Sequence, residues 1–222
     1  MENVRIIEVK QSVFAANNTE ADETRARLKA QKTFMVNLMA SPGAGKTTLL
    51  CRTIEALKDE MKIGVMEADI DASVDAEKIQ AAGARSIQLH TGGMCHMDAS
   101  MTRQGLDAFQ TEDLDLLFLE NIGNLVCPAE FDTGASINVA LLSVPEGDDK
   151  PLKYPLMFQV CDLVMISKMD VKPVFNFEEE RVIKNIHMRN PKAEVIFLSA
   201  KTGENLDQWY NWLRRRVAEW KS

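Results

Sequence analysis

A strand-like apolar run followed by a glycine-rich turn constrains the fold of this chain more than any other feature. Residues 34–40 read FMVNLMA, residues 41–45 read SPGAG, and a helical pattern begins at Lys46 and Thr47. Glycine lets backbone N–H groups curl around an anion, and the following helix directs its positive end to the same place. This order of elements predicts a phosphate-binding loop. The full pattern G-x-x-x-x-G-K-[ST] begins with glycine, where this chain has Ala40.

The residues of this loop have distinct expected roles. Lys46 can reach the β- and γ-phosphates of a nucleotide, which makes it a catalytic candidate as well as a binding residue, and the Thr47 hydroxyl can ligate Mg²⁺. The expected phosphate-binding residues are Gly43, Ala44, Gly45, Lys46, Thr47 and Thr48.

Length and composition exclude several classes of protein. The 222 residues are enough for one large α/β domain or two small ones. A net charge of −7 argues against a general nucleic-acid binder, and no apolar run is long enough to span a membrane. The N-terminus lacks the apolar segment of a signal peptide, and the four cysteines are widely spaced. We therefore expect a cytoplasmic protein with reduced thiols and neither a nucleic-acid nor a membrane partner.

Apolar runs alternate with helical patterns through the rest of the chain. Strands are expected at 33–40, 62–68, 86–89, 115–120, 136–143, 162–167 and 194–198, and helices at about 46–59, 73–82, 98–110, 176–189 and 204–220. Several of these strands are unbroken apolar runs, which suit parallel strands covered on both faces. The pattern predicts an α/β fold in which residues 33–222 form one P-loop domain with a mostly parallel central sheet. Residues 1–32 are expected to form a separate N-terminal segment with a polar helix that starts at Asn18 or Thr19 and lies outside the core.

Carboxylates at strand ends are expected to complete the nucleotide site, because ligands bind at the carboxyl edge of such sheets. Glu120 ends an apolar strand in the manner of a Walker-B acid, and Gly123 follows as a glycine that can sense the γ-phosphate. Asp69 and Asp75 follow the second strand, and either can bind Mg²⁺ or orient the attacking water. The alternative for each acid is a solvated loop residue. The expected Mg²⁺ ligands are Thr47, Asp69 and Glu120, and the catalytic candidates are Lys46, Asp69, Asp75, Glu120 and Gly123.

Two later loops predict recognition of guanine. Residues 167–170 read SKMD and resemble the guanine motif N-K-x-D, so Lys168 would cover the base and Asp170 would accept hydrogen bonds from guanine N1–H and the 2-amino group. Adenine lacks those donors. Ser167 stands where the motif has asparagine, and its shorter hydroxyl is expected not to make the same bridging hydrogen bonds. A second guanine loop is expected at Ser199, Ala200 and Lys201.

Three further residues form a candidate metal site. Cys95 and His96 are adjacent in a glycine-rich loop, and Cys127 lies in the turn after Glu120. Thiolate and imidazole suit Zn²⁺ or Ni²⁺. The position of Cys127 just beyond Gly123 would tie metal binding to the nucleotide state. Three ligands leave a tetrahedral site one short, so a site shared across a two-fold dimer is expected, whereas the alternative is three scattered residues.

Several stretches of the chain resemble the HypB family, the GTPases that help to insert nickel into [NiFe]-hydrogenase. The matching stretches are residues 41–50, 91–99, 120–132, 149–155 and 199–204. The resemblance implies a Ras-like G domain of the dimerising SIMIBI type, with slow GTP hydrolysis and a homodimer when GTP is bound. It also implies Zn²⁺ or Ni²⁺ bound by Cys95, His96 and Cys127 near the dimer interface. The implied partners are a HypA-type metallochaperone and the hydrogenase large-subunit precursor.

Three other functions stay open on the sequence alone. A urease-type nickel-maturation GTPase would carry a Cys-Pro-His motif after the Walker-B strand, where this chain has Cys127, Pro128 and Ala129. A P-loop kinase or ATPase acting on a small molecule is disfavoured by the paired guanine loops. A constitutive zinc-binding structural protein would have a metal affinity that does not respond to GTP.

Overall fold

The computed structural model describes the backbone of residues 9–69 and 74–222 and the side chains of residues 14–68 and 77–222. Its centre is a seven-stranded sheet in the order β3-β2-β4-β1-β5-β6-β7, in which every pair of neighbouring strands is parallel. The strands are β1 (Phe34–Ala40), β2 (Ile63–Asp69), β3 (Arg85–His90), β4 (Leu116–Glu120), β5 (Ile137–Ser143), β6 (Leu163–Ser167) and β7 (Glu194–Phe197). The predicted α/β P-loop fold with a largely parallel sheet is therefore confirmed.

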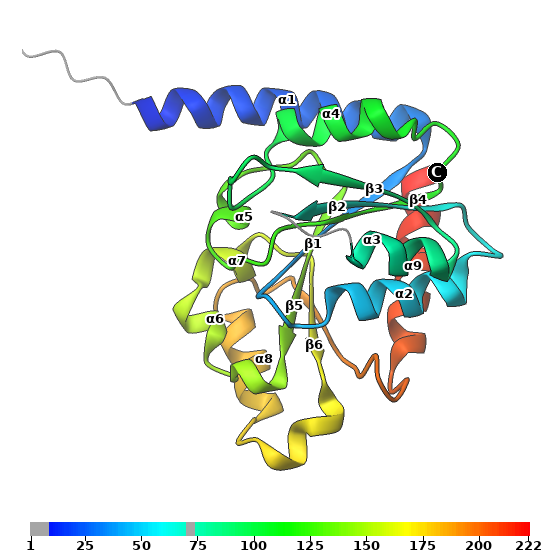
Figure 1. Cartoon of the computed structure of the whole chain (residues 1–222). Coiled ribbons are helices and arrows are strands. Elements are labelled where there is room, and N and C mark those ends of the chain that lie inside the picture. The colour runs from blue at the N-terminus through cyan, green and yellow to red at the C-terminus, as the bar shows by residue number, and fades with distance from the viewer. Residues whose placement is uncertain (1–8, 70–73) are drawn as a thin grey trace, which may run out of the picture.

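Helices cover both faces of this sheet (Figure 1). They are α1 (Val9–Gln31), α2 (Lys46–Leu57), α3 (Val74–Ala82), α4 (Ala99–Phe109), α5 (Cys127–Glu130), α6 (Lys150–Lys153), α7 (Pro155–Gln159), α8 (Glu179–His187) and α9 (Leu206–Lys221), with 3-10 turns η1 (Val144–Glu146) and η2 (Met169–Val174). The side chains of α2, α3 and α9 pack on one face of the sheet, and those of α1, α4, α7 and α8 pack on the other.

The central strand β1 shows why the sheet is apolar on both sides. All of its residues are buried, and successive side chains point to opposite faces. Val36 and Leu38 pack in the cluster that contains α2 and α9, whereas Met35 packs with α1 and α4. Because neither face meets water, the strand reads as an unbroken apolar run.

Helix α1 differs from its prediction. It begins at Val9, and not at Asn18 or Thr19. Although its sequence is mostly polar, Ala21 and Leu28 are fully buried, so the helix packs on the core and does not lie outside it. The prediction was wrong for two reasons. Asparagine and threonine are common helix caps, so they were read as the start of the helix. The buried stripe of the helix is narrow, so the mostly polar sequence was read as a helix outside the core.

Short helices and one helix start were also missed. Helices α5, α6 and α7 have four or five residues each, too few to produce a helical period in the sequence. Helix α8 begins at Glu179, whereas a start at about residue 176 was expected. The carboxylate of Asp148 accepts a 3.0 Å hydrogen bond from the backbone N–H of Glu178, so a distant loop satisfies this helix end.

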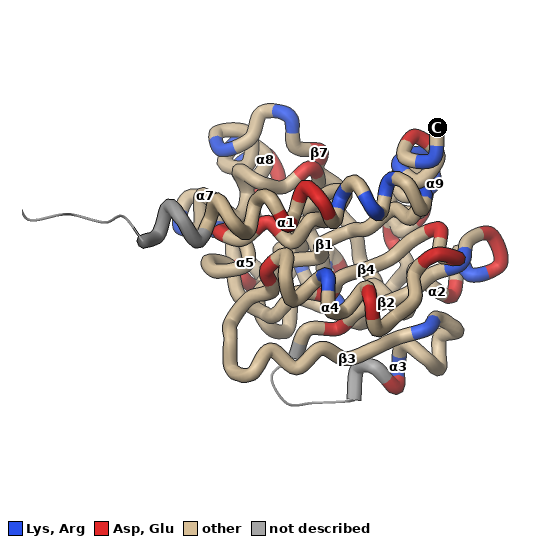
Figure 2. Tube along the Cα trace, turned by 90° about the horizontal axis from the view of Figure 1, so that it is seen from above, with Lys and Arg blue, Asp and Glu red and all other residues tan. Residues whose placement is uncertain are grey.

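The surface charges are mixed. Figure 2 shows Lys and Arg interspersed with Asp and Glu along α1 and α9, so neither helix presents a purely basic row. Across the described residues, none of the helices has both the length and the apolar character needed to cross a lipid bilayer.

Candidate functional site

The loop between β1 and α2 forms one wall of a cavity of about 530 Å³ at the carboxyl edge of the sheet. Gly43 and Gly45 have φ angles of 74° and 104°, a left-handed conformation that other residues rarely adopt. Gly45 is the N-cap of α2, so the first turn of that helix faces the cavity. Lys46 and Thr47 line the same space. A helix N-terminus beside a lysine and two left-handed glycines is suited to hold nucleotide phosphates.

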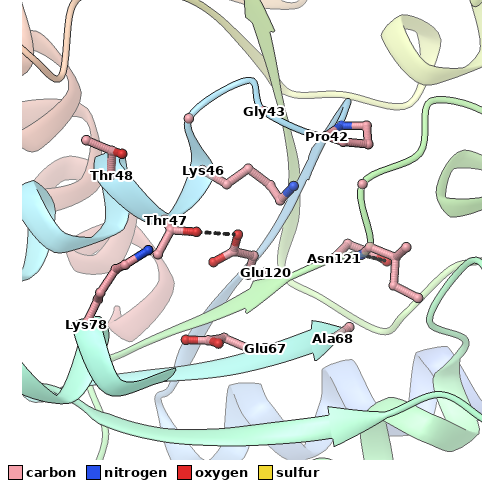
Figure 3. Close-up of a pocket in the computed structure, with 13 residues that line it drawn as sticks. Pro42, Gly43, Lys46, Thr47, Thr48, Glu67, Ala68, Lys78, Glu120 and Asn121 are labelled. Atoms are coloured by element: carbon pink, nitrogen blue, oxygen red, sulfur yellow. Dashed lines mark hydrogen bonds between the residues drawn. The ribbon is translucent and has the colours of Figure 1, made fainter. Parts of the chain in front are cut away.

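Thr47 and Glu120 meet inside this cavity. The Thr47 hydroxyl donates a hydrogen bond of 3.1 Å to Glu120 Oε1, which is drawn as a dashed line in Figure 3. Glu120 ends β4 and is buried. A hydroxyl and a carboxylate are the hard oxygen ligands that Mg²⁺ prefers, so the two predicted side chains fit a magnesium ion bound with the phosphates.

A second carboxylate, Glu67, lines the same cavity and was not predicted as a site residue. Glu67 on β2 is the register partner of Glu120 on β4, and only 3% of its surface is exposed. Lys78 of α3 also lines the cavity, and in Figure 3 its side chain reaches in beside that of Thr47. The two glutamates occupy paired positions near the carboxyl ends of β2 and β4, but this can be recognised only once the pairing of those strands is known.

The two predicted aspartates cannot be placed in the same way. Asp69 is the last residue of β2 and Asp75 lies in α3, but the side chains of both fall outside the described residues. Their proposed roles in binding Mg²⁺ or orienting water stay predictions.

Gly123 brings the loop after β4 against the phosphate-binding loop. A Cβ atom at this position would lie 2.9 Å from Pro42 Cγ and 3.0 Å from the Pro42 backbone nitrogen. Any larger side chain at Gly123 would therefore push the two loops apart. The start of the same loop is anchored, because Asn121 Nδ2 donates a 3.0 Å hydrogen bond to Asn37 Oδ1 within the sheet. The loop after β4 is thus packed closely against the phosphate-binding loop at Gly123.

A second cavity of about 250 Å³ lies on the other side of the phosphate-binding loop. Two loops meet there at Asp170, whose Oδ1 accepts a 2.7 Å hydrogen bond from the Ser199 hydroxyl. The Lys201 ammonium lies 3.9 Å from the other carboxylate oxygen. Ala200 and Lys168 also line this cavity, so the structure brings together the residues of both predicted guanine loops.

Ser167 lines the smaller cavity and is hydrogen-bonded to the phosphate-binding loop. Its hydroxyl donates a 2.8 Å hydrogen bond to the backbone carbonyl of Ala44, and the Lys168 ammonium donates one of 2.7 Å to the carbonyl of Gly43. We expected that the serine would not make the same bridging hydrogen bonds as the asparagine of the motif. The single hydrogen bond seen here does not test that expectation, but it shows that the end of β6 lies directly beside the phosphate-binding loop.

The predicted metal ligands also converge. The ligand atoms of Cys95, His96 and Cys127, hereafter the Cys/His cluster, all lie within 4.8 Å of one another. Cys95 and His96 come from the loop between β3 and α4, and Cys127 is the first residue of α5. Two sulfur atoms and one imidazole nitrogen form a donor set that suits Zn²⁺ or Ni²⁺. Three protein ligands leave a coordination position open.

Burial and hydrogen bonding set the protonation of this cluster. Burial of the His96 ring lowers its pKa, so the imidazole is neutral near pH 7 and has a lone pair to offer. His96 Nδ1 is buried, and no hydrogen-bond partner for it is present among the described residues. A hydrogen bond with Cys95 raises the pKa of the Cys127 thiol, so a metal that binds both sulfur atoms must displace protons.

Aromatic stacking and one polar contact hold the cluster in place. The His96 ring stacks on Phe131 with centroids 4.0 Å apart and an interplanar angle of 12°. No sequence pattern pointed to Phe131. Asn124 Nδ2 donates a 3.4 Å hydrogen bond to the Cys95 carbonyl, which ties the loop after β4 to the loop after β3. The other two cysteines lie apart from this cluster: Cys51 is part of α2, and the buried Cys161 donates its thiol hydrogen to the Met157 carbonyl.

A protein-family model described as "CobW/HypB/UreG, nucleotide-binding domain" matches residues 34–197. Among curated proteins, the hydrogenase maturation factor HypB of Escherichia coli strain K12 is 46% identical over 213 residues, with 96% of this chain and 73% of that protein covered.

Solved structures agree with the sequence comparison. HypB from Helicobacter pylori in complex with nickel is 39% identical with a TM-score of 0.86, over 92% of this chain and 96% of that one. HypB from Archaeoglobus fulgidus is 37% identical with a TM-score of 0.85, over 91% and 99% of the two chains.

Proposed function

Because this chain belongs to the HypB family of hydrogenase maturation factors, we propose that it is a GTP-hydrolysing metallochaperone that binds nickel or zinc and assists insertion of nickel into [NiFe]-hydrogenase. The observation that carries the proposal is the convergence of Cys95, His96 and Cys127. Cys127 lies at the end of the loop that begins beside Glu120 in the nucleotide cavity.

The smaller cavity supports the proposal that the base is guanine. Asp170 has two carboxylate oxygens that accept hydrogen bonds, and the neighbouring backbone at Ala200 can donate to the O6 atom of the base. Adenine presents the opposite pattern of donors and acceptors, so its nucleotides would leave the Asp170 carboxylate without base donors. The ties from Ser167 and Lys168 to the phosphate-binding loop hold the base cavity at a fixed distance from the phosphates.

The larger cavity supports the proposal of GTP hydrolysis. Lys46 would bind the β- and γ-phosphates, and Thr47 and Glu120 would hold Mg²⁺, which would supply positive charge to the phosphate oxygens. Asp69 or Asp75 completes this set by binding the ion or by orienting the water. Gly123 touches Pro42 of the phosphate-binding loop, so loss of the γ-phosphate changes the loop that leads to Cys127.

The open coordination position favours a shared site. In the GTP-bound state a second copy of this chain would bring cysteine ligands to the Cys/His cluster, and the homodimer would separate or rearrange after hydrolysis. Met94 and Val126, which adjoin two of the ligands in sequence, are 43% and 50% exposed and provide apolar surface for such an interface. A HypA-type metallochaperone and the hydrogenase large-subunit precursor are the proposed partners in nickel transfer.

The experiment that tests this function measures Ni²⁺ and Zn²⁺ binding together with GTP hydrolysis. We expect Cys95→Ala and Cys127→Ala to lose metal affinity and to keep GDP affinity. Cys51→Ala is the matched control, because Cys51 lies on α2 outside the cluster. If Cys95→Ala leaves metal affinity and stoichiometry unchanged, the proposed metal site is wrong.

A further inference from the structure

Helix α1 connects the two loops that supply the Cys/His cluster. Asn17 of this helix is buried, with 8% of its surface exposed. Its Oδ1 accepts a 3.0 Å hydrogen bond from the backbone N–H of Ala99, and its Nδ2 donates one of 2.9 Å to the backbone carbonyl of Asp132. Ala99 comes three residues after His96, and Asp132 comes five residues after Cys127. One side chain thus contacts the backbone downstream of both groups of ligands.

The contact with Ala99 has a specific structural reason. Ala99 is the first residue of α4, and N–H groups in the first turn of a helix have no partner within the helix. Asp98 caps the N–H of Met101 with a 2.8 Å hydrogen bond, and Asn17 supplies the acceptor for Ala99. The start of α4, and with it the loop that carries His96, is therefore fixed from α1.

Arg25 strengthens the contact with the second loop. Its guanidinium donates hydrogen bonds of 2.8 Å to both carboxylate oxygens of Asp132, and its Nε donates one of 3.0 Å to the Ala135 carbonyl. The helix backbone also approaches this loop closely, because a Cβ atom on Gly134 would lie 2.9 Å from the carbonyl oxygen of Ala21. Two turns of α1 are thus fitted against the segment that follows Cys127.

An aromatic stack adds a third connection. Phe14 of α1 contacts Phe131 with ring centroids 5.1 Å apart, and Phe131 stacks on His96. By comparison, the hydrogen bond from Asn124 to the Cys95 carbonyl, which joins the two loops directly, is long at 3.4 Å. Shorter hydrogen bonds, of 2.9 and 3.0 Å, connect the two loops through Asn17 of α1.

We propose that Asn17 is a positioning residue for the Cys/His cluster and that α1 braces, through Asn17 and Arg25, the two loops that carry the metal ligands. This inference rests on the proposed metal-binding function of the cluster. Outer groups that orient metal ligands typically change metal affinity 10- to 100-fold when they are removed, which sets the expected size of the effect (about 10-fold or more).

The test compares three variants of the full chain by Ni²⁺ affinity, measured against a chromogenic chelator, and by the absorption spectrum of bound Co²⁺. Asn17→Leu removes both hydrogen bonds of Asn17, and Arg25→Gln removes the charged hydrogen bonds from Arg25 Nη2 to the Asp132 carboxylate. The matched control is Arg27→Gln, which removes the same charge from the same helix but breaks ion pairs with Asp107 and Glu112. Arg25 is partly exposed, so Arg25→Gln is expected to leave the folding of α1 intact. It therefore tests the inference even if Asn17→Leu destabilises α1.

We expect Asn17→Leu and Arg25→Gln to bind Ni²⁺ about 10-fold or more weakly and to change the Co²⁺ spectrum, with GDP affinity unchanged. Arg27→Gln should match the unmodified chain in all three measurements. Unchanged Ni²⁺ affinity and Co²⁺ spectra in both variants would overturn the inference. Cys127→Ser separates the two claims: if it also binds Ni²⁺ normally, the proposed cluster itself is wrong, and if it alone loses Ni²⁺, only the brace is wrong.

Discussion

The hydroxyl of Thr47 donates a 3.1 Å hydrogen bond to Glu120, which joins the first turn of α2 to the end of β4 inside the larger cavity. The two residues are 73 positions apart in the chain, and the parallel pairing of β1 with β4 brings them together. A divalent ion placed between them would bind the protein and the nucleotide phosphates at once.

We therefore expect Glu120→Gln to reduce GTP hydrolysis by roughly 100-fold, because an amide oxygen replaces the charged ligand of Mg²⁺. The amide still accepts the hydrogen bond from Thr47, so the folded structure is retained. The measurement is phosphate release under single-turnover conditions. Glu55→Gln, on the exposed side of α2, is the matched control. Hydrolysis at the normal rate by Glu120→Gln would contradict the assigned role.

The choice of base is predicted to depend on Asp170. Asp170→Asn should weaken GTP and GDP binding by at least about 100-fold, because two hydrogen bonds to a charged acceptor contribute roughly 1.5–3 kcal/mol each. The new amide can donate to the 2-carbonyl of xanthine, so binding of xanthosine nucleotides should improve. Displacement of a fluorescent guanine nucleotide measures all of these affinities. An unchanged preference for GTP over ATP would show that Asp170 does not read the base.

The hydrogen bond from Ser167 to Ala44 is predicted to contribute more to the stability of the fold than to the affinity for nucleotide. Ser167→Ala leaves the Ala44 carbonyl without this donor, so the free energy of unfolding should fall by about 1 kcal/mol. GDP affinity should change by less than about tenfold, since the contacts of Asp170 with the base stay intact. Urea unfolding and GDP titration test the two statements separately. A loss of GDP binding without a loss of stability would assign the serine to ligand binding instead.

Asp115, which lies just before β4, is expected to make the free energy of unfolding depend on pH. Burial alone would raise the pKa of this carboxyl, but hydrogen bonds from Lys221 and from the backbone N–H of Lys62 hold the pKa below its ordinary value of 3.8. The ionised form therefore stabilises the folded chain above the ordinary pKa, and the contribution is lost as the pH falls through the lower folded-state pKa.

For this reason Asp115→Asn should lower the free energy of unfolding at pH 7 by about 1 kcal/mol, and the difference from the unmodified chain should shrink below about pH 4. Urea unfolding at pH 7, 5 and 3.5 measures the difference. Asp59→Asn, in the exposed turn after α2, should show no such difference at any of these pH values. A constant difference across the range would mean that the charge of Asp115 is not involved.

The sequence was informative where function lies in contiguous residues or at element ends. Gly43, Gly45 and Lys46 form one local motif, and Glu120 ends an apolar strand, so each could be predicted without tertiary structure. The Cys/His cluster could be proposed from residue types, but its geometry depends on two loops that only the fold brings within 4.8 Å.

The missed residues depend on packing between distant segments. Glu67 becomes a cavity residue only through its register with Glu120, which the order of strands in the sheet determines. Asn17 occurs in a run that resembles a helix cap, whereas its partners are the backbone groups of Ala99 and Asp132. Local patterns cannot identify such partners, because the separation along the chain exceeds the range over which a helical or strand period can be recognised.

The most direct test of the account is the Ni²⁺ affinity and oligomeric state of the same preparation without nucleotide, with GDP and with a non-hydrolysable GTP analogue. We predict that the GTP analogue produces dimers and changes the affinity or stoichiometry of Ni²⁺, and that Cys127→Ser abolishes this change while GDP affinity is retained. If Ni²⁺ binding and dimerisation are the same in all three nucleotide states, the Cys/His cluster is a static metal site and the proposed nucleotide switch is wrong.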